Sequence, residues 1–216
     1  MQTKSLIKEF DKLQAIYGDN TLDAIYGAGQ INNPKTCLVF MNPTGRNITA
    51  NKKWLGLKAP WIGTKNVWRM FFRLGFFDET FLNEINDKSP TEWDYQFAEN
   101  VYSEVSNNSM YITNLSKATQ VDARPLKNDV FRKYLSLFRE EIGIVKPKII
   151  ITFGNQVSSI VLDKQVKVSD YRKQYEEIDI NGNIFKVFPV YYPVGQGMRN
   201  IKKAEEDINW IMKTQI

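Results

Sequence analysis

The chain has 216 residues, 43% hydrophobic and 25% charged, and its 29 Lys and Arg against 24 Asp and Glu give a net charge of +5. These totals are ordinary for one globular domain, and no apolar run approaches the roughly 18 residues of a membrane-spanning helix. The sequence has no histidine, which excludes Ser-His and Cys-His nucleophile pairs and histidine-ligated metals. Its one cysteine, Cys37, excludes an internal disulfide.

Hydrophobic periodicity and turn residues predict the secondary structure in chain order. The expected elements are a helix over 3–17, a buried strand over 36–41, helices over 65–75 and 92–105, a short strand over 110–113, a helix over 128–145, a buried strand over 148–154, a hairpin within 175–192 and a C-terminal helix from about 201. Short strands alternating with longer helices indicate a three-layer α/β/α fold with a mainly parallel central sheet of about four strands. We expect one domain over 1–216, with residues 1–30 as an N-terminal helical extension.

Four polar or glycine-rich segments follow the predicted strands. They are NPTGRN (42–47), TNLSK (113–117), FGNQ (153–156) and YPVGQG (192–197). Ligands of open α/β sheets bind beyond the carboxyl ends of the strands, so these four segments can build one site. The alternative is that they are ordinary connections, since loops after strands are commonly rich in turn residues.

Taken in order, these segments resemble the uracil-DNA glycosylase superfamily. The matching stretches are MNPTG (41–45), APWIGTKNVWRMFFRLGFFDE (59–79), YITNLSK (111–117), KPKIIITFGNQV (146–157) and YYPVGQGMRN (191–200). MNPTG resembles the first active-site motif in its Asn-Pro-Gly version, with Thr44 as an extra residue. This version is found in the mismatch-specific (G:U/T) uracil-DNA glycosylases, the branch that the chain resembles most. The resemblance runs from about Cys37 to the C-terminus.

The resemblance implies a repair enzyme that hydrolyses the N-glycosidic bond of uracil, or of a related deaminated base, flipped out of DNA. The implied catalytic residues are Asn42, which would orient the attacking water, and Tyr192, which occupies the position of the family's His or Asn. The implied base-binding residues are Met41, Trp61 as the stacking aromatic, and Asn114, whose amide suits the O4 and N3–H of uracil.

The same resemblance implies which residues contact DNA outside the base pocket. After the first motif, Arg46 and Asn47 would reach the backbone, and Lys117 would contact phosphate. The remaining candidates surround the last motif, where a wedge residue would enter the base stack, and they are Gly195, Gln196, Met198 and Arg199. Val194 replaces the family's serine, a departure that bears on activity together with Tyr192.

The expected partner is single- or double-stranded DNA, bound by a monomer. We expect no cofactor, no metal and no membrane association. The N-terminus lacks the apolar core of a signal peptide, which favours an intracellular protein, in the cytoplasm with the nucleoid.

Three alternatives compete with the enzyme. A catalytically silent relative would bind DNA or a nucleobase without cleaving it. An unrelated α/β nucleotide-binding protein is disfavoured, because the chain has neither G-x-G-x-x-G nor a P-loop. A metal-dependent nuclease is disfavoured because no paired carboxylates follow the predicted strands, and Asp122 and Asp129 are expected in a loop and at a helix start.

Overall fold

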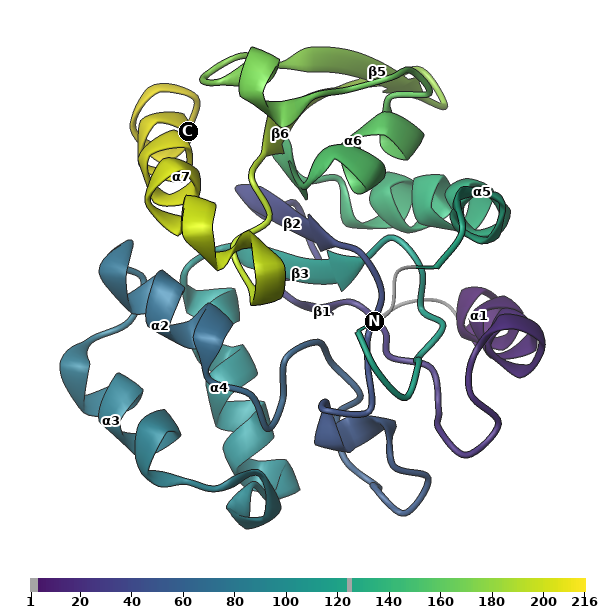
Figure 1. Cartoon of the computed structure of the whole chain (residues 1–216), viewed down its shortest axis with the longest axis vertical. Helices are drawn as coiled ribbons and strands as arrows, with labels where there is room; N and C mark the ends of the chain where they lie inside the picture. The colour runs from purple at the N-terminus through teal and green to yellow at the C-terminus, as the bar shows by residue number, and fades with distance from the viewer. Residues whose placement is uncertain (1–3, 124–125) are drawn as a thin grey trace.

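The fold is built around one twisted sheet (Figure 1), seen in a computed structural model that describes residues 4–123 and 126–216. Within these residues the sheet has six strands in the order β1-β3-β2-β4-β6-β5. Their bounds are β1 Ala28–Gly29, β2 Thr36–Phe40, β3 Met110–Asn114, β4 Ile149–Phe153, β5 Glu176–Ile180 and β6 Asn183–Val190. The four central strands are parallel, and the two edge strands, β1 and β5, pair antiparallel.

One face of the sheet carries the larger core. It is covered by α2 (Asn66–Arg73), α3 (Glu79–Asp87), α4 (Tyr95–Asn107) and α7 (Ile201–Thr214). Alternate strand residues point to this face, as the two-residue period of a strand requires. Those from the central strands are Leu38, Phe40, Met110, Ile112, Ile149, Ile151, Phe153, Phe188 and Val190.

The opposite face is covered by α5 (Asn128–Val145) and α6 (Asn155–Val161). The other strand residues, such as Cys37, Val39 and Tyr111, pack here. Helix α1 (Lys4–Tyr17) packs against α5, with its Leu6 and Phe10 beside Tyr134 of α5. Figure 1 shows α1 beside α5 on this side of the molecule.

The predicted fold class is confirmed, with two more strands than expected. The sequence prediction underestimated the sheet because β1 has only two residues and β5 is the outer arm of the predicted hairpin. Two helices, α3 and α6, were not predicted. Helix α6 has only seven residues, NQVSSIV, too few for a helical period to show. Within residues 4–30, the part of this segment that the structure describes, only α1 is helical, and Ala28–Gly29 belongs to the sheet.

Candidate active site

The carboxyl ends of β2 and β3 continue into two loops that stay paired. The backbone N–H groups of Leu115 and Ser116 donate to the carbonyls of Phe40 (2.8 Å) and Met41 (3.0 Å). Further along, Gly45 N–H donates to Gln120 (2.7 Å) and Gln120 N–H to Pro43 (3.1 Å). The segment that carries Asn42 is thus fixed along the segment that follows Asn114. The first and third sequence motifs form one rigid edge.

Phe40, the last residue of β2, joins the second and last motifs to this edge. The centroid of its ring lies 4.8 Å from that of Trp61 and 6.2 Å from that of Tyr192, both in edge-on arrangements. The Phe153 ring of β4 stacks on it with a centroid distance of 4.4 Å. Such aromatic pairs prefer these offset and perpendicular arrangements. Trp61 and Tyr192, 131 positions apart in the numbering, are therefore brought together over one buried phenylalanine.

Asn114 lies on the same face of the sheet as Phe40. The two residues are partners in the β2–β3 register, and Asn114 has the parity of Met110 and Ile112, which face the larger core. Its side chain is only 3% exposed. The structure thus places Asn114 beside the ring that Trp61 and Tyr192 contact.

The polar atoms of this group are largely without protein partners. Among the described residues, no hydrogen bond joins the amide of Asn114, the hydroxyl of Tyr192 or the indole N–H of Trp61 to another protein group. The Asn42 amide donates to its neighbour's carbonyl, Pro43 O, at 3.1 Å, which leaves its side-chain oxygen as an acceptor. Asn114 is buried and the Trp61 indole nitrogen is a buried atom without a partner, whereas buried polar groups in proteins are nearly always hydrogen-bonded, so this cluster indicates a candidate binding site.

The backbone of Trp61 is held in an unusual conformation. Its φ of +69° lies in the left-handed region, which a bulky residue rarely adopts. Its carbonyl compensates by accepting from the Thr64 hydroxyl (2.7 Å), the Thr64 N–H (3.1 Å) and the Trp68 indole (3.2 Å). The loop is therefore built to keep the Trp61 ring against Phe40.

Two glycines leave the room that Tyr192 needs. A Cβ on Gly197 would lie 2.0 Å from the Tyr192 carbonyl oxygen, so no larger residue fits there. Gly154, with φ +86°, is the N-cap of α6, and a Cβ there would lie 3.4 Å from the Cβ of Tyr192. Burial raises the pKa of the Tyr192 phenol above its ordinary value of 10.0, so the hydroxyl is a neutral donor at physiological pH.

The structure corrects the expectation that Lys117 contacts phosphate. Its side chain is fully buried, and its ammonium donates to Glu141 (2.6 Å), the Thr113 hydroxyl (2.7 Å) and the Asn114 carbonyl (2.5 Å). Tyr111 and Thr113 both donate to the same carboxylate at 2.8 Å. This cluster lies behind the strand end, on the α5 face, where DNA cannot reach it.

The expectation that Asn47 reaches the DNA backbone is also corrected, because its side chain is buried and hydrogen-bonded within the protein. Its oxygen accepts from the N–H and hydroxyl of Thr49, and its amide donates to the Ala59 carbonyl at 2.7 Å. It closes the loop between the first and second motifs. Met41 packs its side chain into the opposite core, so any contact with a base would have to come from its backbone.

The remaining candidates lie at the rim. Arg46, Gly195, Met198 and Arg199 are exposed, and the last three belong to the 3₁₀ turn η4 (Gly195–Asn200) before α7. The Gln196 side chain lies outside the described part of the structure. Sequence reasoning missed Phe40 and Glu141. Phe40 resembles any last residue of a buried strand, and Glu141 resembles any charged residue of α5, so neither carried a local signal.

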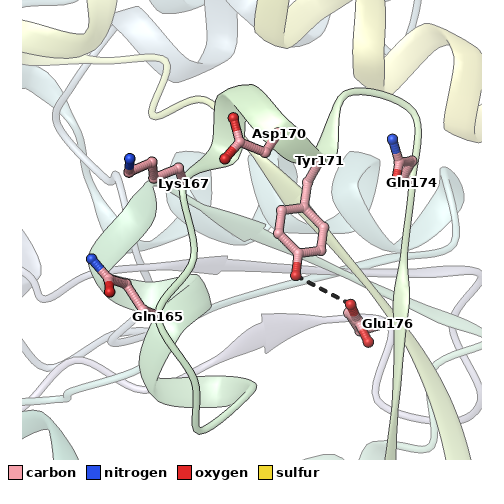
Figure 2. A pocket seen from close by; sticks show the side chains of 6 residues that line it. All are labelled: Gln165, Lys167, Asp170, Tyr171, Gln174 and Glu176. Atoms are coloured by element: carbon pink, nitrogen blue, oxygen red, sulfur yellow. Dashed lines mark hydrogen bonds between the residues drawn. The ribbon is translucent and has the colours of Figure 1, made fainter.

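A cavity of about 500 Å³ lies elsewhere (Figure 2). It is lined by side chains around η3 (Val168–Tyr171) and the start of β5, including Lys167, Asp170 and Glu176. The Glu176 carboxylate is already bonded to Tyr171 and Lys164. Nothing in its lining matches the unsatisfied cluster around Phe40.

The described residues contain no group of three or more Cys, Asp or Glu placed to hold a metal ion. They also contain no helix long and apolar enough to cross a membrane.

A mainly parallel sheet with a polar cluster beyond its carboxyl edge defines an α/β protein with its site at the usual position for this class. A model of the family described as the uracil DNA glycosylase superfamily matches residues 26–212. The match covers most of the chain, which therefore belongs to this superfamily. Comparison with curated proteins finds no match. Membership indicates a DNA glycosylase-like hydrolase with DNA as its substrate.

Proposed function

We propose that the chain is a monofunctional, metal-independent DNA glycosylase of the mismatch-specific type, acting as a monomer on uracil or a related deaminated base flipped out of DNA. The observation that supports this proposal is the group gathered around Phe40: the Asn42 oxygen, the Asn114 amide and the Tyr192 hydroxyl, for which the described residues offer no hydrogen-bond partner, together with the Trp61 ring. A flipped base offers a flat ring and a hydrogen-bonding edge, which these groups complement.

In this reaction a water oxygen bonds to the sugar carbon as the bond from that carbon to the base nitrogen breaks. The base leaves with the electron pair and the water gives its proton to solvent. Asn42 would orient the water through its oxygen, because an amide cannot take the proton. The Tyr192 hydroxyl would donate a hydrogen bond to the O2 of the departing base, where negative charge develops.

Asn114 would set the choice of base. An amide offers one acceptor and two donors, which pair with the N3–H and O4 of uracil. Cytosine presents the opposite pattern at these two positions, so the same amide orientation would reject it. The Trp61 ring would stack on the base, an interaction worth about 1–3 kcal/mol.

The test is single-turnover release of base from labelled oligonucleotides. Substrates carry uracil in single strands, opposite guanine and opposite adenine, together with hypoxanthine. Asn42→Ala is expected to lower the release rate by about a hundredfold, because misplacing a reactant has that order of cost. The matched control is Asn183→Ala, which alters an exposed asparagine in the β5–β6 hairpin and leaves the rate unchanged. Equal rates for Asn42→Ala and wild type would refute the catalytic role.

A second candidate is a silent relative that recognises a base and does not cleave. It is favoured by Tyr192, whose neutral phenol stabilises a leaving anion less than a cation would. This candidate predicts that wild-type protein binds uracil-containing DNA more tightly than normal DNA and releases no base from either. The release assay and a binding assay on the same oligonucleotides separate the two.

A further inference from the structure

A loop beside the site carries an exposed apolar tip. Residues 48–58 leave the sheet after the first motif and return just before Trp61. The Asn47 amide holds the Ala59 carbonyl, and Ile48 N–H donates to Ile62 at 3.2 Å, so the two ends of this loop are joined. The base of the loop therefore lies beside the segments that carry Asn42 and Trp61.

The tip of the loop is Leu55, which is 97% exposed. It is not on a loose segment. The Trp54 indole donates to the Leu57 carbonyl at 3.1 Å, Trp54 N–H donates to Asn51 at 2.9 Å, and Lys53 N–H donates to the Asn51 side chain at 2.9 Å. Leu55 contributes no burial to the fold, and with the exposed Tyr95 against the same turn it forms an apolar surface that is open to a partner.

The surroundings of Leu55 favour a nucleic acid as that partner. Lys52 and Lys53 are exposed; the Lys52 ammonium donates to the Asn20 carbonyl at 2.7 Å, and within the described residues neither lysine forms an ion pair with a carboxylate. Tyr95, 64% exposed, lies at the start of α4 with its Cβ against Gly56, the residue that follows Leu55. Two exposed lysines just before an apolar residue, with an exposed tyrosine against the same turn, suit phosphates around stacked bases.

We propose that the 48–58 loop is a second DNA-contacting element, in which Leu55 enters the base stack of a duplex while Lys52 and Lys53 contact its phosphates. This inference rests on the proposed function, and it adds to the contacts expected from η4. A wedge at this position would hold the gap left by a flipped nucleotide from the side of the first motif. It would matter for a duplex and not for a single strand, whose bases need no unstacking.

The first experiment measures unstacking with 2-aminopurine, a base whose fluorescence rises when it leaves the stack. It is placed next to uracil in a duplex, and next to an abasic analogue in a duplex that cannot be cleaved. Wild type is expected to raise the fluorescence, and Leu55→Ala to lose most of that rise. Leu55→Met should retain it, because methionine is also a flexible apolar wedge. Ile184→Ala is the matched control, since Ile184 is 59% exposed on the β5–β6 hairpin.

The second experiment measures base release with the same variants. Leu55→Ala should slow release from duplex by about tenfold, equal to about 1.4 kcal/mol, and leave release from single strands within about twofold. Lys52→Gln with Lys53→Gln should weaken duplex binding and reduce its salt slope by about two. The control is Lys148→Gln, an exposed lysine at the amino end of β4.

Three results would overturn the wedge: no fluorescence rise with wild type, a Leu55→Ala protein equal to wild type on the duplex, or an equal loss of release on single strands. Failure of the proposed function has a different pattern. In that case wild type releases no base from any substrate, while the fluorescence measurement still decides whether Leu55 enters the stack.

Discussion

Thr113 and Asn114 are neighbours at the end of β3, and their side chains face opposite sides of the sheet. On the Thr113 side, Lys117, Glu141 and Tyr111 form a cluster in which each charged or hydroxyl group has a protein partner at 2.5–2.8 Å. On the Asn114 side, the Asn42 amide donates to Pro43 O at 3.1 Å, and within the described residues the side chains of Asn114 and Tyr192 and the Trp61 indole make no protein hydrogen bond. The Lys117 cluster is buried, the Asn114 side is partly exposed, and both lie at the same edge of the sheet.

The difference separates a structural polar cluster from a binding one. A buried charge is tolerated when its partners are complete, and removing one partner then costs several kcal/mol. A buried amide or hydroxyl without partners weakens the fold in isolation and is repaid by a ligand. The Lys117 cluster should therefore control stability, and the Asn114 cluster should control activity.

The largest expected effect is on the structural side. Lys117→Met removes the buried ammonium that donates to Glu141 at 2.6 Å, so the free energy of unfolding should fall by about 3–5 kcal/mol. Urea denaturation of the variant and of wild type measures the loss. The double variant Lys117→Met with Glu141→Leu should recover part of it, because both charges of the pair are then removed together. A single variant as stable as wild type would contradict the comparison.

Asn114→Ala should give the opposite result. The rate of base release should fall by about a hundredfold, because the amide's contacts with the base are lost at the reacting centre. The free energy of unfolding should change by less than about 1 kcal/mol, since no protein hydrogen bond is removed. Measuring both quantities on one preparation decides the matter. A large loss of stability would mean that the amide has a structural role instead.

Tyr192→Phe should have a smaller effect on the rate. It keeps the ring against Phe40 and removes one neutral donor, so release should slow by about tenfold and stability should remain unchanged. Phenylalanine tests the hydroxyl alone, because it keeps the ring whose centroid lies 6.2 Å from that of Phe40. An unchanged rate would show that the hydroxyl does not contact the leaving base.

The smallest expected effect is that of pH. Because burial raises the pKa of Tyr192 above 10.0, the ratio of wild-type to Tyr192→Phe rates should stay constant from about pH 7 to 9.5. The stability linked to this group is complete below the unfolded-state value of 10.0 and is lost as the pH rises through the folded-state pKa. A ratio that declines with a midpoint below 10 would mean that the hydroxyl is more solvated than its burial indicates.

The sequence was sufficient for the parts of the fold with a strong period. The buried runs 36–40 and 149–153, and the apolar faces of α5 and α7, are long enough to be recognised, and the structure confirms them. The edge strand β1 was missed because two residues have no period. Helix α3 was missed because only three of its nine residues, Phe81, Leu82 and Ile85, are apolar.

The site was less accessible to sequence reasoning than the fold. The motif order brought Asn42, Trp61, Asn114 and Tyr192 into consideration, and the structure brings all four to the same strand ends. Lys117 was misjudged because its partner, Glu141, is 24 positions away on α5, and a lysine after a strand looks the same whether buried or exposed. Asn47 was misjudged for the same reason, since its partner Ala59 is 12 positions away.

The bond between the Asn47 amide and the Ala59 carbonyl has a consequence for protein engineering. It ties the two ends of the 48–58 loop together, while Thr49 and Ala50 are buried and the Ala50 carbonyl accepts from Asp23 N–H at 2.8 Å, so the inner part of the loop belongs to the core. The exposed side chains of Lys52, Lys53 and Leu55 are the positions that can be exchanged, which suits libraries that alter substrate preference while the reacting groups stay in place.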